Sequence, residues 1–179
     1  MGSALTPTAD PPEMAAARRA VQKIRERLDH PVIDSDGHFV EFLPEVMERL
    51  EALAGASAGA HLETVVQASR LAQTLDAEQR RQLSLTRIPF WALPARNTLD
   101  RATAMLPRLL HQRLEEFGLD FAVVYPTYGL VGVHLQEAEQ RQVLCRAFND
   151  WAADAFGPYR DRLTPTACIP MHTPEEALA

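Results

Sequence analysis

Short apolar runs alternate with helical stretches along the chain, and this order constrains the fold more than any other feature. The run Phe121–Val124 (FAVV) is continuously apolar, which is typical of a strand buried in a parallel sheet. Two further short runs occur at residues 32–35 and 163–169, and helical patterns separate the three. This order predicts βαβ units, in which right-handed crossovers connect parallel strands. We therefore expect an α/β fold with about three parallel strands and flanking helices.

Apolar residues at helical spacing, together with proline and glycine, predict where the helices lie. We expect helices over residues 13–29, 44–53, 61–83, 103–117 and 137–156, and the start of another at the N-cap Thr173. In the helix over 103–117 the apolar face is expected to consist of Leu106, Leu109, Leu110, Leu114 and Phe117, with Gly118 as the stop. Loops are expected at residues 54–60, 87–96 and 129–134.

The composition is that of one ordinary globular domain, with 179 residues of which 46% are apolar. Residues 1–12 contain three prolines and are expected to form a flexible leader, so the domain would cover residues 13–179. The chain carries 18 basic and 24 acidic residues, and no basic cluster favours nucleic acid as a partner. Because no stretch approaches the roughly 20 apolar residues of a membrane span, we expect a cytoplasmic protein without a membrane partner. Cys145 and Cys168 are expected to be buried free thiols.

The stretch VIDSDGHFVE, residues 32–41, places two carboxylates and an imidazole at the end of the first expected strand. Side chains at i and i+2 of a strand share a face, so Asp34, Asp36 and His38 are expected to project to one side. Carboxylate oxygen and imidazole nitrogen suit a divalent ion such as zinc or manganese. Alternatively, an aspartate caps a turn and His38 bonds a backbone carbonyl, and spacing alone favours this structural interpretation.

Three segments of the chain resemble a known family. Residues 32–41, 97–130 and 145–177 are similar to the N-terminal part of the amidohydrolase-related family of the amidohydrolase superfamily, which includes aminocarboxymuconate semialdehyde decarboxylase and the resorcylate decarboxylases. The resemblance implies a metal-dependent (β/α)₈ TIM barrel whose first strand ends in two metal ligands, here Asp36 and His38. It implies one divalent ion, zinc first, with manganese or magnesium as alternatives. An aspartate stands at the first ligand position, where the family often has histidine.

The resemblance also implies an activity, which is decarboxylation or hydrolysis of a small carboxylated or ring substrate. In this interpretation the metal binds a substrate oxygen. Asp34 would orient the ligands without binding the metal itself. Tyr125, Thr127 and His172, which follow the second and third strands, would contact the substrate. The catalytic acid or base is not among the residues that the resemblance maps, and we expect the full-length enzyme to form homo-oligomers.

Three strands are fewer than a barrel needs, since a TIM barrel takes about 250 residues. We therefore expect the chain to be an incomplete piece of a longer enzyme, and to be inactive by itself because two ligands are too few for a tight site. Two other classes of function stay open. One is a non-catalytic, truncated barrel that binds a partner through its open sheet edge. The other is a small α/β ligand-binding domain whose strand-end aspartates coordinate Mg²⁺.

Other polar and aromatic residues have structural interpretations that match or outweigh the functional ones. His61 and His111 fall on helical stretches and are expected at the surface. His134 lies in the expected loop at 129–134, where a substrate loop and a plain surface loop are equally plausible. Trp91 is expected to pack in a satellite core, and Asn149 to bond on a helix surface.

Overall fold

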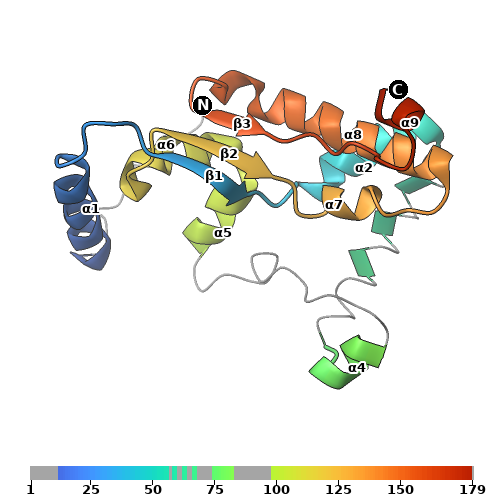
Figure 1. Ribbon diagram of the computed structural model, residues 1–179, viewed down its shortest axis with the longest axis horizontal. Coiled ribbons are helices and arrows are strands. Elements are labelled where there is room, and N and C mark those ends of the chain that lie inside the picture. The colour runs from blue at the N-terminus through green and yellow to red at the C-terminus, as the bar shows by residue number, and fades with distance from the viewer. Residues whose placement is uncertain are drawn as a thin grey trace, which may run out of the picture.

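The computed structural model describes residues 12–56, 58–59, 62–63, 66–67, 74–82 and 98–178 (Figure 1). Three parallel strands form one sheet in the order β1-β2-β3, with β1 at Ile33–His38, β2 at Phe121–Tyr125 and β3 at Leu163–Pro165. The predicted α/β class with parallel strands is therefore confirmed, and the complete barrel stays a prediction. Most of the predicted leader, His61, Trp91 and the predicted loop at 87–96 lie outside the described residues.

Helices follow the strands in the expected order, and proline marks the first turn of several of them. Their bounds are α1 Pro12–Arg25, α2 Leu43–Ala54, α4 Ala77–Gln82, α5 Thr98–Met105, α6 Pro107–Phe117, α7 Gly129–Gly132, α8 Ala138–Phe156 and α9 Pro174–Leu178. A short 3₁₀ turn, η2, covers Gly157–Tyr159 directly after α8. No helix among the described residues is long and apolar enough to cross a membrane.

The helix predicted over residues 103–117 is divided into α5 and α6. Pro107 disfavours helical backbone at the residue before it, and Leu106 is extended, with φ −114° and ψ 105°. The predicted apolar face is correspondingly wrong at its two ends, because Leu106 and Phe117 are exposed while Leu114 is buried. The predicted stop is confirmed, since Gly118 adopts a left-handed conformation with φ 71° and bonds back to α6.

Three further predictions are corrected by the structure. β1 continues to His38, three residues beyond the predicted end, and residues 129–132 form the short helix α7 where a loop was expected. β3 ends at Pro165, four residues before the predicted end. Beyond it, the side-chain amide of Asn149 on α8 takes the place of a strand partner: it donates to the carbonyl oxygen of Cys168 at 2.9 Å and accepts from its N–H at 2.7 Å.

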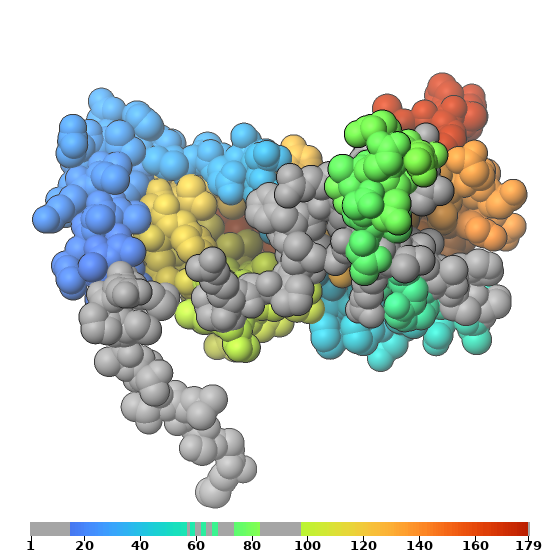
Figure 2. Space-filling model, turned by 90° about the horizontal axis from the view of Figure 1, so that it is seen from below, coloured from blue at the N-terminus to red at the C-terminus, as the bar shows by residue number. Residues whose placement is uncertain are grey.

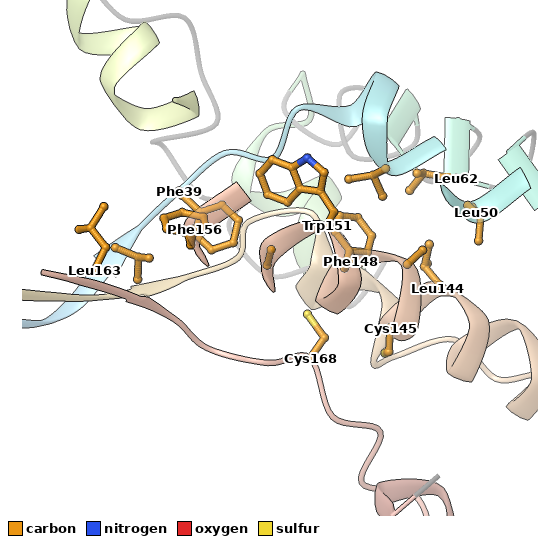
Figure 3. Close-up of a cluster of buried hydrophobic side chains, with 14 of the residues drawn as sticks. Phe39, Leu50, Leu62, Leu144, Cys145, Phe148, Trp151, Phe156, Leu163 and Cys168 are labelled. Atoms are coloured by element: carbon orange, nitrogen blue, oxygen red, sulfur yellow. The ribbon is translucent and has the colours of Figure 1, made fainter. Parts of the chain in front are cut away.

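One face of the sheet packs against helices, and the core lies between them (Figure 3). Ala122 and Val124 of β2 point into this core, whereas Phe121, Val123 and Tyr125 alternate on the other face and are partly exposed. The prediction that FAVV is buried throughout is therefore wrong for this part of the chain. Large side chains of α8 fill the core, among them Phe148, Trp151 and Phe156.

Both cysteines are free and buried, as predicted. Burial raises the pKa of Cys145 to about 11 and that of Cys168 to about 12. The two thiols therefore behave as small apolar groups of the core.

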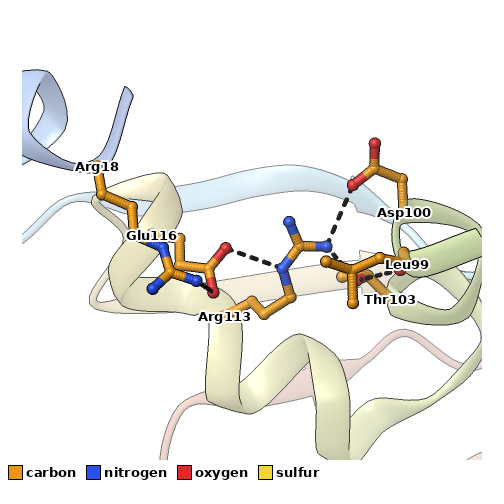
Figure 4. A network of polar contacts seen from close by, with 6 residues as sticks. All are labelled: Arg18, Leu99, Asp100, Thr103, Arg113 and Glu116. Carbon is orange, nitrogen blue, oxygen red and sulfur yellow. Dashed lines mark hydrogen bonds and ion pairs between the residues drawn. The ribbon is translucent and has the colours of Figure 1, made fainter. Parts of the chain in front are cut away.

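A buried arginine connects α5 and α6, and its partner Glu116 extends the network to α1 (Figure 4). Arg113 donates to Glu116 at 2.9 Å, to Asp100 at 3.2 Å and to the hydroxyl of Thr103. Glu116 also pairs with Arg18 of α1. Because the guanidinium is almost fully enclosed, these carboxylates offset the cost of burying its charge.

Helix α4 differs from the other helices in its surroundings. Figure 1 shows it standing apart from the sheet, and Figure 2, which is seen from below, shows it in the foreground. None of its residues is buried.

The C-terminal helix α9 is held by an ion pair with α8. Arg141 donates to both carboxylate oxygens of Glu176, at 2.8 and 2.5 Å, and also to the carbonyl oxygens of Leu135 and Gln136. Thr173 is the predicted N-cap, since its hydroxyl accepts the N–H of Glu176 at 3.2 Å. The hydrogen bond from Arg141 is the main cause that lowers the pKa of Glu176 below its ordinary value of 4.5.

We expect acid to release α9 from α8. Because the pKa of Glu176 is lower in the folded chain than in the unfolded one, its stabilising contribution is complete above 4.5 and is lost as the pH falls through the folded value. Hydrogen exchange of the α9 amides, followed against pH, measures this release. The Glu176→Gln variant should exchange at a rate that changes much less over the same range. Identical pH profiles in the two proteins would contradict the assignment.

Candidate functional site

The end of β1 contains a bulge, which changes the directions of the predicted site residues. Asp34 pairs with Ala122 of β2 and Gly37 with Val124, so three steps along β1 match two steps along β2. A Cβ at Gly37 would lie 3.1 Å from both the Asp34 carboxylate and Val124 Cγ1, on the helix-covered face. The expectation that Asp34, Asp36 and His38 share a face is therefore wrong for Asp34, because the bulge interrupts the alternation.

Position 37 favours glycine because there is little room for a Cβ atom. A Cβ there would also lie 3.0 Å from the carbonyl oxygen of Val123, which is backbone and cannot easily move aside. Asp34 completes the bulge, because its carboxylate accepts the N–H of Asp36 at 3.0 Å. This is the turn interaction that the sequence left open as the alternative. The same hydrogen bond holds the backbone at Asp36 in place. A role of Asp34 in orienting metal ligands stays a prediction.

Asp36 and His38 lie close together at the carboxyl end of β1. His38 Nε2 is 3.9 Å from Asp36 Oδ1, and the side chains are 21% and 91% exposed, respectively. Tyr125, at the end of β2, pairs with His38 and places its ring centroid 5.8 Å from that of the imidazole, with 40° between the planes. The structure therefore brings together three of the residues predicted from sequence.

The chemistry of this pair fits one edge of a metal coordination shell. Ligand atoms bind zinc at about 2.0–2.2 Å, so two tetrahedral ligands lie about 3.3 Å apart. The observed 3.9 Å is slightly wider, and a small rotation of the exposed Asp36 side chain covers the difference. Within the described ranges, no group of three or more His, Cys, Asp or Glu residues could hold a metal. The pair would thus supply two of the four ligands that a tetrahedral site uses.

The other two predicted substrate contacts have different surroundings. Thr127 is buried, and its hydroxyl donates to the carbonyl oxygen of Phe39 at 2.6 Å. His172 is exposed and lies near Glu176, whose pKa it helps to lower after Arg141. Figure 1 shows α9, which carries Glu176, beyond α7 and away from the tip of β1. A substrate contact by Thr127 or His172 stays a prediction.

Three other polar residues that were named from the sequence lie in positions that agree with structural roles. His111 is only partly exposed and its Nε2 lies 3.1 Å from both carboxylate oxygens of Asp161. That hydrogen bond is the main cause that lowers the pKa of Asp161. His134 is exposed directly after α7, and Asn149 bonds to backbone as described above.

Glu41 is a residue of this region that the sequence analysis did not select. It follows His38 by three positions and is only 1% exposed. Its carboxylate accepts the backbone N–H groups of Thr127, Tyr128 and Gly129. Burial raises the pKa of Glu41 above its ordinary value, and the N–H donors offset part of that effect. One sequence feature could have identified Glu41: it is an ionisable residue inside the otherwise apolar stretch FVEFL.

Comparison with known proteins finds no family model that matches the chain, and no curated protein matches it. The resemblance to the amidohydrolase-related family therefore stays a prediction, which depends on the three quoted segments. What the ends of β1 and β2 can bind therefore follows from the chemistry of the side chains found there.

Proposed function

We propose that this chain is part of a metal-dependent enzyme of the amidohydrolase type, acting on a small carboxylated or ring substrate by decarboxylation or hydrolysis. One observation carries the proposal: Asp36 and His38 lie 3.9 Å apart at the carboxyl end of a parallel strand. In α/β folds with parallel sheets, ligands and substrates bind at this end of the strands. One carboxylate and one imidazole form a donor set that zinc and manganese accept.

The residues of the site have separable roles in this proposal. Asp36 and His38 would hold the cation, which when bound would polarise a substrate oxygen or lower the pKa of a water molecule. Tyr125 lies beside the imidazole, where it limits the rotation of the ring and offers an aromatic surface to a ring substrate. Asp34 holds the N–H of Asp36 and so fixes the direction from which that carboxylate approaches.

A non-catalytic ligand-binding domain is the second candidate, and the exposure of one ligand favours it. The Asp36 side chain is 91% exposed, so it is largely hydrated. Mg²⁺ keeps several of its waters and is commonly held by only one or two carboxylates. Under this alternative the chain binds Mg²⁺ in preference to zinc, and His38 contributes little to the affinity.

We expect Asp36→Ala and His38→Ala each to weaken zinc and cobalt binding by at least about tenfold. Isothermal titration measures the zinc affinity, and the absorption spectrum of Co²⁺ reports whether nitrogen and oxygen donors surround it. The chain offers a matched control in its second Asp–His pair, Asp161 and His111, which lie 3.1 Å apart away from the ends of β1 and β2. Asp161→Asn and His111→Ala should leave the affinity unchanged.

Two outcomes would contradict the proposal. Equal cation affinity in wild type, Asp36→Ala and His38→Ala would exclude this pair as the binding site. A preference for Mg²⁺ that depends on Asp36 and not on His38 would instead support the ligand-binding domain.

A further inference from the structure

The chain beyond β1 stays buried for three residues and ends in a carboxylate. Phe39, Val40 and Glu41 are all nearly inaccessible to solvent. Oε1 of Glu41 accepts the N–H of Gly129 at 2.8 Å and that of Thr127 at 3.1 Å. Its Oε2 accepts the N–H of Tyr128 at 2.9 Å, and that of Thr127 at 3.2 Å. Both oxygens are therefore occupied by backbone donors of the segment that follows β2.

The same two segments are joined by two further hydrogen bonds. The N–H of Phe39 donates to the carbonyl oxygen of Tyr125 at 3.0 Å. The hydroxyl of Thr127 donates back to the carbonyl oxygen of Phe39 at 2.6 Å. These hydrogen bonds hold residues 39–41 against residues 125–129, immediately beyond the ring contact between His38 and Tyr125.

A carboxylate is a costly group to place here if packing were its only role. Burying an ionised carboxylate costs several kcal/mol before its hydrogen bonds are counted, and an apolar side chain of similar size would carry no such cost. Charge-assisted hydrogen bonds from several N–H groups offset much of this cost. They do so only when the N–H groups are held in one arrangement around the carboxylate. What the carboxylate adds over an apolar residue is therefore a defined geometry of the turn at 127–129.

We propose that Glu41 is a positioning residue of the candidate metal site: by binding the N–H groups of residues 127–129, it fixes the end of β1, with Asp36 and His38, against the end of β2, with Tyr125. The effect on cation binding rests on the function proposed above. The effect on the arrangement of the two strand ends does not, and the two can be measured separately.

The first measurement compares Glu41→Gln with Glu176→Gln. The glutamine side chain keeps the length of the glutamate, but it loses the charge and turns an NH₂ group toward backbone donors. Glu176 is the matched control, a mostly buried carboxylate that accepts hydrogen bonds from Arg141 at α9. We expect Glu41→Gln to weaken Co²⁺ binding by about tenfold, the scale of losing an orienting contact. Glu176→Gln should lower the stability and leave the affinity within about twofold.

The second measurement needs no metal. Nuclear Overhauser effects between the rings of His38 and Tyr125 report the relative placement of the two strand ends. We expect them in the wild type and in Glu176→Gln, and we expect them to weaken in Glu41→Gln. If the wild type binds no Co²⁺, the proposed function fails, and the ring contact alone decides the role of Glu41. A Glu41→Gln variant that keeps both the ring contact and the cation affinity would overturn the inference.

A measurement on the wild type covers the case in which Glu41→Gln does not fold. The amides of Thr127, Tyr128 and Gly129 should exchange with solvent slowly, because each donates to the buried carboxylate. Exchange as fast as that of the exposed residues Gln136 and Glu137 would show that the carboxylate does not hold them, and would overturn the inference.

Discussion

Replacing Trp151 by alanine is expected to lower the free energy of unfolding by about 3–5 kcal/mol. The side chain is 2% exposed and lies at the centre of the aromatic cluster in Figure 3. Its ring centroid is 5.8 Å from that of Phe39 and 6.5 Å from that of Phe156, the latter in an edge-on arrangement. The indole N–H donates to Glu45 of α2 at 2.8 Å. The substitution therefore removes a large apolar volume together with the hydrogen bond to Glu45, which is an exposed residue.

Urea unfolding of three variants separates these two losses. Trp151→Phe keeps most of the aromatic packing and loses the donor to Glu45, so its loss should be smaller than that of Trp151→Ala. Arg146→Ala removes an exposed side chain of the same helix and should change the stability by less than about 0.5 kcal/mol. A loss for Trp151→Ala no greater than that for Arg146→Ala would mean that α8 does not pack as described.

The second large effect is expected at Gly129, where alanine should destabilise the protein by about 1–3 kcal/mol. A Cβ at this position would lie 2.7 Å from Sγ of Cys168 and 3.1 Å from Cβ of Pro126. Cys168 is held in place by two hydrogen bonds with the side chain of Asn149. The added methyl group would therefore displace α7 or the segment that follows β3, and with α7 the donors to Glu41.

A double-mutant cycle tests the steric cause directly. Cys168→Ala removes the sulfur atom that a Cβ at Gly129 would meet, so Gly129→Ala should cost less in that background, with a coupling of about 0.5–3 kcal/mol. Gly157→Ala is the control, because a Cβ there meets nothing within 4 Å and the backbone is right-handed. Its stability should be unchanged or slightly raised. Losses that simply add in the Gly129 and Cys168 double variant would exclude the steric explanation.

Much of the fold follows from local patterns in the sequence. The apolar runs place β1, β2 and β3 in the right order, and Pro44 and Gly118 mark helix ends because their backbone preferences are local. The break before Pro107 was missed, although it follows from the same kind of local preference. The length of β3 does not follow from such a pattern. Its apolar run continues past Pro165, but at Cys168 the hydrogen-bond partner is the side chain of Asn149 on α8. A strand end that is set by tertiary contacts leaves no local signal.

The candidate site was predictable to a similar extent. That Asp36, His38 and Tyr125 meet follows from the rule that parallel strands end at the same edge. The direction of Asp34 did not follow, because one extra residue in β1 reverses the alternation and has no reliable sequence pattern. Glu41 was missed for a different reason. Its partners are 86–88 positions away in the sequence, so its burial depends on a strand pairing that must be known first.

The two buried thiols of the core can report when the protein transiently unfolds. With pKa values of about 11 and about 12, Cys145 and Cys168 are protonated and enclosed at neutral pH. Alkylating reagents attack the thiolate, so they should modify these residues only in molecules that have transiently unfolded. Labelling rates followed by mass spectrometry would then give the opening frequency of α8 and of the segment after β3, without any engineered cysteine.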